Sequence, residues 1–158
     1  MLLIDERRAA GSAGGDDDRG LRALVQALAV PRHRVANPRG NAATRELVCD
    51  HLAQLGFHVR VEGPFGNVVA RPRVPRGRPL TLVGAHFDAV PDCPGADDNA
   101  SGVAVMLACA RETPNDASVG FVAFNAEEEG LLGSRDFVEP PCTGWGCSRW
   151  CTCSRWWA

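Results

Sequence analysis

The sequence contains no apolar run long enough to cross a membrane. Its longest apolar stretches, such as Gly102–Ala110, are far shorter than the roughly 20 residues that a membrane-spanning helix needs. The apolar start at Met1–Ile4 is followed at once by charged residues at positions 5–8, so no secretion signal is recognisable. We therefore expect no membrane partner and a cytoplasmic location, or a secreted protein if residues are missing before Met1.

Neither sign of charge is in excess, and lysine is absent altogether. The formal net charge is −2 over 158 residues, a balance that gives no indication of a nucleic-acid partner. The use of arginine in place of lysine says little about function. Hydrophobic residues make up 45% of the chain and charged residues 23%. This composition is typical of a soluble globular protein, and the length suits one domain with a buried core.

Cysteine and tryptophan are scarce until the last part of the chain. All four tryptophans and four of the seven cysteines follow Pro141, and the fragment C-S-R-W occurs twice there. Four cysteines suit a small structural zinc site or a disulfide knot, but the paired C-x2-C spacing is missing. We therefore expect a flexible, acidic segment over 1–20, a partial compact domain over 21–140, and an atypical tail over 141–158 that is not native sequence.

The hydrophobic pattern predicts alternating helices and strands. Helices are expected over Leu21–Val30, Asn41–Leu55, Ser101–Arg111 and Leu131–Val138, and strands over Phe57–Val61, Asn67–Ala70, Leu80–Ala85 and Val119–Phe124. The continuous apolar run at Leu80–Ala85 indicates a central strand that is covered on both faces. This order of elements is typical of an α/β sandwich with a mixed or mostly parallel sheet. In such sheets, chemistry gathers outside the carboxyl ends of the strands.

The first polar motif, G-A-H-F-D, ends the apolar run at Leu80–Ala85. It places His86 and Asp88 two residues apart. An imidazole at this point can bind a metal, and a carboxylate two residues later can orient the ring and raise its basicity. The alternative is a polar turn after a strand, without any ligand.

The second motif is P-G-A-D-D-N-A-S-G, over Pro94–Gly102. Asp97 and Asp98 lie at the start of an expected helix, where acidic side chains are favoured by the helix dipole and where Asn99 or Ser101 can cap the backbone. A carboxylate about ten residues after a histidine, across a loop rich in Gly and Pro, is also a suitable zinc ligand. Such a carboxylate can bridge two cations if both of its oxygens are free.

The third motif is N-A-E-E-E-G, over Asn125–Gly130, directly after the expected strand at Val119–Phe124. Three consecutive glutamates repel one another, so their presence needs a reason. They can form the solvated start of a helix. Alternatively, one glutamate binds a metal and its neighbour transfers a proton from metal-bound water.

In this order, the three motifs resemble the co-catalytic di-zinc aminopeptidases, the family that includes aminopeptidase Y and glutamate carboxypeptidase. The resemblance covers roughly Thr81–Val138 and rests on H-F-D, P-G-A-D-D-N-A-S-G and A-E-E-E-G-L-L-G-S. It implies a three-layer α/β/α sandwich of the zinc exopeptidase type. It also implies two zinc ions and a peptide substrate with a free N-terminus.

The resemblance also implies a role for each matching residue. His86 matches a terminal zinc ligand, Asp98 the carboxylate that bridges both metals, and Glu128 a further ligand. Glu127 matches the general base that takes the proton of a metal-activated water, and Asp88 supports His86 from behind. The peptide bond after Asp98 is expected to be cis.

Part of the family pattern is missing from this sequence. His86 is its last histidine, and Asp136, the only aspartate after the glutamates, falls on an expected helix. We therefore expect one zinc site to be retained, a sheet that is incomplete at its C-terminal end, and an apolar edge that lowers solubility.

Two alternatives to a zinc aminopeptidase stay open. The chain can be a catalytically dead fragment that binds metal without hydrolysing peptides. It can also belong to the related zinc carboxypeptidases and deacylases, whose H-x-D-x-V-P pattern is matched at His86–Pro91. The second and third motifs favour the aminopeptidase type.

Overall fold

The computed structural model describes residues 13–73, 80–114 and 117–138. Its helical elements are α1 (Ala13–Leu28), α2 (Pro38–Gln54), the π-type turn η2 (Ala96–Ser101), α3 (Gly102–Glu112) and α4 (Leu132–Val138). Its strands are β1 (His58–Glu62), β2 (Asn67–Arg71), β3 (Thr81–His86) and β4 (Val119–Phe124). The predicted Cys/Trp tail lies outside the described residues, as do residues 1–12.

The strands form one mixed sheet in the order β1-β2-β4-β3. The sheet is mixed as predicted, but the expectation of mostly parallel pairing is wrong for the described strands, because only β3 and β4 run parallel. The short turn at residues 63–66 joins β1 to β2, and a connection of this length allows only antiparallel pairing of these two strands. The antiparallel pairing of β2 with β4 depends on contacts between segments that are far apart in the sequence.

Strand β3 lies at an edge of the described sheet, so the prediction of a central, doubly covered strand is wrong for this part of the chain. None of its residues is fully buried, whereas β4, with a neighbour on each side, is buried along most of its length. A run of apolar residues indicates two apolar faces, but it does not say how many strands lie beside them.

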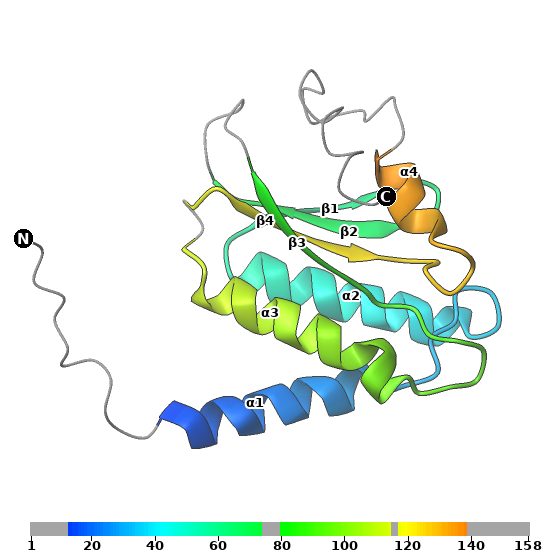
Figure 1. Ribbon diagram of the computed structural model, residues 1–158, viewed down its shortest axis with the longest axis horizontal. Helices are drawn as coiled ribbons and strands as arrows, with labels where there is room; N and C mark the ends of the chain where they lie inside the picture. Colours follow the sequence, from blue (N-terminus) through cyan, green and yellow to red (C-terminus); the bar gives the residue numbers. More distant parts are fainter. Residues whose placement is uncertain (1–12, 74–79, 115–116, 139–158) are drawn as a thin grey trace, which may run out of the picture.

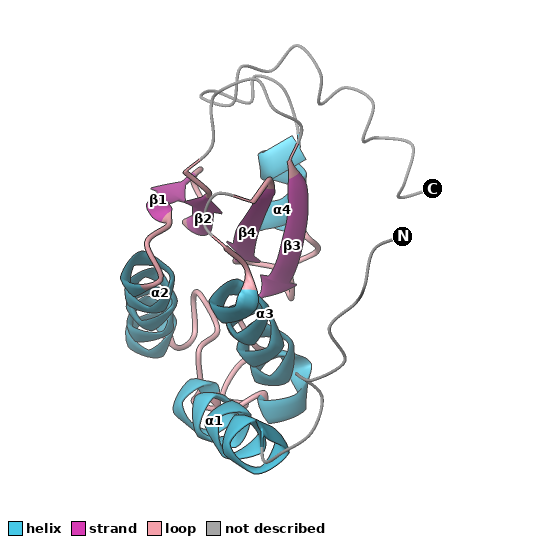
Figure 2. Ribbon diagram, turned by 90° about the vertical axis from the view of Figure 1, so that its left-hand side faces the viewer, coloured by secondary structure: helices cyan, strands magenta, loops and turns pink. Residues whose placement is uncertain are grey.

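The main core lies between the sheet and helices α2 and α3, which cover one of its faces (Figures 1 and 2). Val48 and Leu52 of α2 are fully buried, and Phe57 packs edge-on against Phe121 with their ring centroids 5.3 Å apart. In α3, the buried positions include the four predicted ones, Val103, Met106, Leu107 and Ala110. Each large apolar side chain buried here contributes about 1.5–3 kcal/mol.

Helix α1 begins earlier than expected. The prediction of a flexible segment through residue 20 is wrong from Ala13 onward, because the helix runs from there to Leu28. Leu21, Leu24 and Val25 pack against the core, and this packing stabilises a helix of modest intrinsic propensity. In Figure 2, α1 lies beneath α3, on the side away from the sheet.

Helix α4 lies on the opposite face of the sheet from α2 and α3 (Figure 1). Phe137 of α4 contacts Phe124 of β4 edge-on, with ring centroids 5.6 Å apart. The described residues therefore form a sheet with helices on both faces. None of the helices in this part of the chain is long and apolar enough to cross a membrane.

Candidate metal centre

The candidate site forms where β3 and β4 end side by side. The two strands are parallel, with His86 opposite Phe124, and the N–H of Phe87 donates a 2.8 Å hydrogen bond to the carbonyl of Phe124. Parallel strands bring the residues that follow them to the same edge of a sheet. The first and third motifs therefore meet in space, although about 40 residues separate them.

Asp88 joins these two segments from a fully buried position. Its two carboxylate oxygens accept hydrogen bonds of 3.1 Å each from the backbone N–H groups of Glu127 and Glu128. Burial alone would raise the pKa of this carboxyl. The nearby imidazole of His86 and the two N–H groups stabilise the charged form more strongly, so the pKa of Asp88 lies below its ordinary value.

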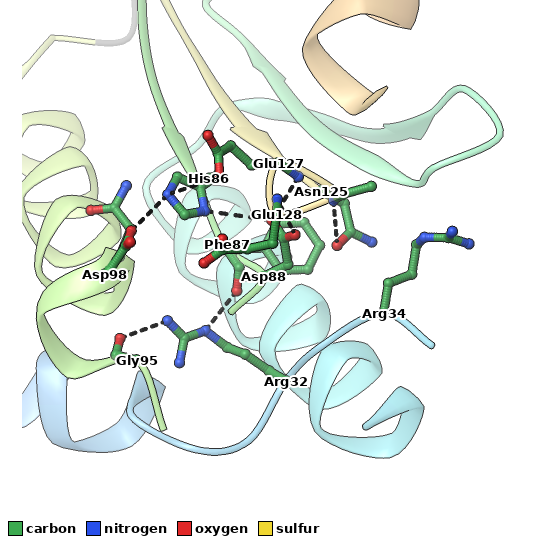
Figure 3. Close-up of polar contacts among 12 residues, drawn as sticks. Arg32, Arg34, His86, Phe87, Asp88, Gly95, Asp98, Asn125, Glu127 and Glu128 are labelled. Carbon is green, nitrogen blue, oxygen red and sulfur yellow. Dashed lines mark hydrogen bonds and ion pairs between the residues drawn. The ribbon is translucent and has the colours of Figure 1, made fainter. Parts of the chain in front are cut away.

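His86 lies between carboxylates on both sides of its ring (Figure 3). Its Nδ1 is 3.5 Å from Oδ1 of Asp88, and its Nε2 is 3.1 Å from Oδ1 of Asp98 and 3.9 Å from Oε2 of Glu127. Burial by itself would lower the pKa of the imidazole. The carboxylates favour its protonated form, however, and the net result is a raised pKa.

Asp98 reaches the site from η2, the turn that leads into α3. Its side chain is 74% exposed, and the peptide bond between Asp98 and Asn99 is cis, as the resemblance implies. Of the two expected capping residues, Ser101 occupies the N-cap position of α3 without a side-chain capping bond. Oδ1 of Asn99 accepts a 3.0 Å hydrogen bond from the N–H of Gly102, the first residue of the helix. The hydroxyl of Ser101 donates to the carbonyl of Asp97 instead.

The three consecutive glutamates have different surroundings. Glu129 forms a bidentate pair with Arg34, with distances of 2.8 Å to Nε and 2.6 Å to Nη2. At Glu128, burial and the negative charges of Asp98 and Glu127 raise the pKa, and the imidazole of His86 offsets this only in part. The repulsion that the sequence implies is therefore relieved at Glu129 and retained at the site.

One group of possible ligands stands out among the described residues. His86, Asp98 and Glu128 each offer a ligand atom, and all three atoms lie within 4.8 Å of one another. One imidazole and two carboxylates are a donor set that suits Zn²⁺, with a fourth position left for water. A cation would also relieve the repulsion that raises the pKa of Glu128. The residues therefore fit a zinc ion. Asp136 is not in the group, since its carboxylate lies against the turn at Gly63.

Arg32, which the sequence patterns did not single out, lies fully buried below the site. Its guanidinium donates to backbone carbonyls of both ligand segments, at Phe87, Pro94 and Gly95, and to the carbonyl of Val30. Burial lowers its pKa, and the negative charges of Asp88 and Asp98, among others, oppose this shift. No sequence motif marks such a residue, because its acceptors are main-chain atoms.

Three buried asparagines fix the start of the glutamate segment. The side chains of Asn125 and Asn41 exchange hydrogen bonds of 2.9 and 3.1 Å, and Oδ1 of Asn67 accepts a 3.0 Å bond from the N–H of Asn125. Asn67 also donates to the carbonyl of Gly133 at the start of α4. Helix α2, strand β2 and helix α4 thus hold the point from which the glutamates project.

This geometry defines the general class: an α/β protein with a candidate metal-binding group beside the carboxyl ends of adjacent sheet strands. The family is identified by comparing the amino-acid sequence with models of known families. The model of Peptidase family M28 matches residues 67–146, which include all three motifs. The chain belongs to this family.

Two curated relatives and one solved structure illustrate the likeness. The chain is 42% identical over 140 residues to the probable lipoprotein aminopeptidase LpqL of Mycobacterium tuberculosis, covering 86% of this chain and 26% of the relative. It is 45% identical over 74 residues to aminopeptidase YwaD of Bacillus subtilis, covering 45% and 16%. A glutaminyl cyclase from Bacteroides thetaiotaomicron superimposes with a TM-score of 0.64 at 20% identity, covering 82% of this chain and 58% of that one.

The sequence relatives and the solved structure support different conclusions: the relatives support the family, and the solved structure supports the fold. The chain spans about a quarter or less of the length of the two curated relatives. The likeness to the cyclase shows the fold alone, and one fold can host different reactions. The choice of reaction therefore depends on the site residues.

Proposed function

We propose that this chain carries one zinc site of an exopeptidase of the aminopeptidase type, held by His86, Asp98 and Glu128. The observation that carries the proposal is the grouping of these three side chains, whose ligand atoms lie within 4.8 Å of one another. The names of the curated relatives, aminopeptidases in both cases, support peptide substrates with a free N-terminus.

Zinc, when bound, supplies a Lewis acid that polarises the scissile carbonyl and makes water more acidic. Glu127 is the general base in this proposal. Its partly exposed carboxylate lies 3.9 Å from Nε2 of His86, so it borders the ligand group without belonging to it. It accepts a proton from the attacking water and returns it to the leaving amine.

Asp88 supports both the ligand His86 and the segment that carries Glu127 and Glu128. Its carboxylate lies behind the imidazole of His86 and accepts the N–H groups of Glu127 and Glu128. A buried partner of this kind keeps a ligating histidine in one orientation and raises its basicity. In our proposal it also sets the distance between the ligand Glu128 and the base Glu127.

Hydrolysis of aminoacyl-p-nitroanilides in the presence of zinc tests the proposal. We expect activity in the parent chain and a loss of about 10²–10⁴-fold in Glu127→Gln, since general-base catalysis contributes that much. Asp97→Asn is the matched control, because Asp97 is an exposed carboxylate of the η2 turn to which we assign no role. Full activity in Glu127→Gln would refute the assigned base.

A zinc-binding measurement and a comparison of N-acetylated with free peptides separate the two alternatives. Tight zinc binding without hydrolysis would favour a metal-binding fragment. Hydrolysis of N-acetylated peptides in preference to free ones would favour a carboxypeptidase or deacylase. The proposed aminopeptidase reaction requires the opposite preference.

A further inference from the structure

Arg32 connects two ligand segments that are separated in the sequence. It belongs to the loop between α1 and α2, about 55 residues before His86, and its side chain is fully buried. Its Nε donates a 2.6 Å hydrogen bond to the carbonyl of Phe87, and its Nη2 donates a 2.8 Å bond to the carbonyl of Gly95. Its Nη1 donates to the carbonyl of Pro94 and, at 3.1 Å, to the carbonyl of Val30 in its own loop. Figure 3 shows the guanidinium between these segments.

Three of the four acceptors flank the ligands closely. Phe87 lies between His86 and Asp88, while Pro94 and Gly95 come directly before the turn that carries Asp98. One planar guanidinium therefore sets the spacing between the histidine segment and the aspartate segment. The guanidinium bonds to backbone carbonyls and not to the ligand side chains, so it acts on the ligands through the backbone and through its charge.

The local backbone is built for this contact. Gly95 has a φ of +51°, and a Cβ at this position would lie 2.3 Å from the carbonyl oxygen of Asp98 and 3.1 Å from Nη2 of Arg32. A side chain would therefore push against both the arginine and the ligand turn. Glycine accepts this conformation without a steric penalty, which allows the close approach.

Arginine suits the position better than any other residue. Its guanidinium carries five N–H donors in a rigid plane, so one side chain can satisfy several carbonyls in different directions. Lysine offers a single nitrogen on a flexible stem and cannot reach both segments at once. The carboxylates of Asp88, Asp98 and Glu128 lie near enough to act on the charge of Arg32, which helps to keep the buried cation charged.

We propose that Arg32 is a positioning residue of the metal site, which holds the His86 segment and the Asp98 segment at the separation that one zinc ion requires. The inference rests on the proposed function, in which these residues bind zinc. It adds a residue that is remote in sequence and that bonds to the backbone of the ligand segments.

The test compares zinc affinity with fold stability in the full 158-residue chain. The variants are Arg32→Met, Arg32→Lys and the control Leu52→Ala, which removes a fully buried core side chain of α2 and leaves the three carbonyl contacts intact. Zinc affinity is measured by competition with a chromophoric chelator, at a temperature where each variant is folded by circular dichroism. The absorption spectrum of bound Co²⁺ reports the ligand geometry independently of activity.

We expect Arg32→Met to weaken zinc binding by about 10- to 100-fold, as loss of supporting hydrogen bonds around metal ligands does, and to alter the Co²⁺ spectrum. Arg32→Lys should lie between Arg32→Met and the parent. Added guanidinium ion, far below denaturing concentrations, should restore affinity to Arg32→Met. Leu52→Ala should lose stability but keep its zinc affinity and Co²⁺ spectrum.

Two results would overturn this inference and leave the proposed function standing. One is a parent-like zinc affinity and Co²⁺ spectrum in Arg32→Lys. The other is a loss of zinc affinity in Leu52→Ala as large as that in Arg32→Met. Arg32→Lys carries the test if Arg32→Met does not fold. A parent chain that binds no zinc, or whose zinc affinity is unchanged in His86→Ala, would overturn the proposed function and this inference with it. The two failures are therefore distinguishable.

Discussion

The buried carboxylate of Asp88 accepts a 3.1 Å hydrogen bond from the backbone N–H of Glu128. This contact joins the end of β3 to the segment after β4, and the second oxygen of Asp88 makes the same kind of bond to the N–H of Glu127. Most of the hydrogen bonding of Asp88 is thus directed at the glutamate segment, because its distance to Nδ1 of His86 is longer, at 3.5 Å. The residue acts as a structural link as well as a partner of the histidine.

Asp88→Asn tests this link. The amide keeps the size of the carboxylate but places an NH₂ group against one of the two backbone N–H donors, which leaves that donor without a buried acceptor. We expect the free energy of unfolding to fall by about 1–3 kcal/mol and zinc affinity to fall by about 10- to 100-fold. Chemical denaturation and zinc competition measure the two effects. A variant with parent-like values in both would contradict the role of Asp88.

The three glutamates should respond differently to the same substitution. Glu128→Gln removes a proposed ligand and should abolish tight zinc binding, whereas Glu127→Gln should bind zinc but lose hydrolysis. Glu129→Gln weakens the pair with Arg34 and should cost less than about 1 kcal/mol of stability, with zinc binding and activity retained. Isothermal titration and a hydrolysis assay on the three variants provide the comparison. Loss of zinc in Glu129→Gln, with Glu128→Gln unaffected, would reverse the assignment.

Zinc binding should depend on pH through His86. The carboxylates around it raise the pKa of its metal-free form, and a protonated imidazole cannot bind metal. Below that pKa, binding must release a proton, so affinity should rise about tenfold per pH unit and level off once the imidazole is neutral. The plateau should begin above the ordinary histidine pKa of about 6.5. Competition titrations across this range, repeated in buffers of different ionisation enthalpy, report the released proton. An affinity independent of pH from about 6 to about 8 would contradict this expectation.

Gly95 and Gly130 provide a matched pair of substitutions. Both have positive φ, +51° and +95°, but a Cβ at Gly95 would meet the carbonyl of Asp98 at 2.3 Å, whereas a Cβ at Gly130 would meet nothing within 4 Å. Both alanine variants carry a backbone penalty of about 1 kcal/mol. Gly95→Ala should in addition displace the Asp98 turn and weaken zinc binding. Equal zinc affinity in the two variants would show that the close packing at Gly95 does not matter for the metal.

The sequence pattern predicted the helices and strands better than it predicted which strands pair with one another. The helix over Ser101–Arg111 and the strand over Val119–Phe124 are confirmed, because periodicity and apolar runs report which faces are buried. They do not report which strands pair. The positions of β3 at the edge and of β2 antiparallel to β4 depend on contacts between distant segments, which local patterns do not encode.

The candidate site could be predicted only in part, again because local patterns do not report contacts between distant segments. His86, Asp98 and Glu128 belong to short motifs at the ends of elements, and the fold brings the three together. Arg32 could not be predicted, because it binds backbone carbonyls that every residue has. Arg34 carried a weak signal, since a run of three glutamates calls for a cation, but nothing local indicated which arginine supplies it.

The most direct test of the central claim is the position of zinc in a crystal of the full chain, located by anomalous diffraction at the zinc absorption edge. Our account predicts a peak within about 2.0–2.2 Å of Nε2 of His86 and of carboxylate oxygens of Asp98 and Glu128, the usual distances for such ligands. A peak on cysteine sulfurs, or at a place where His86 is not a ligand, would contradict it.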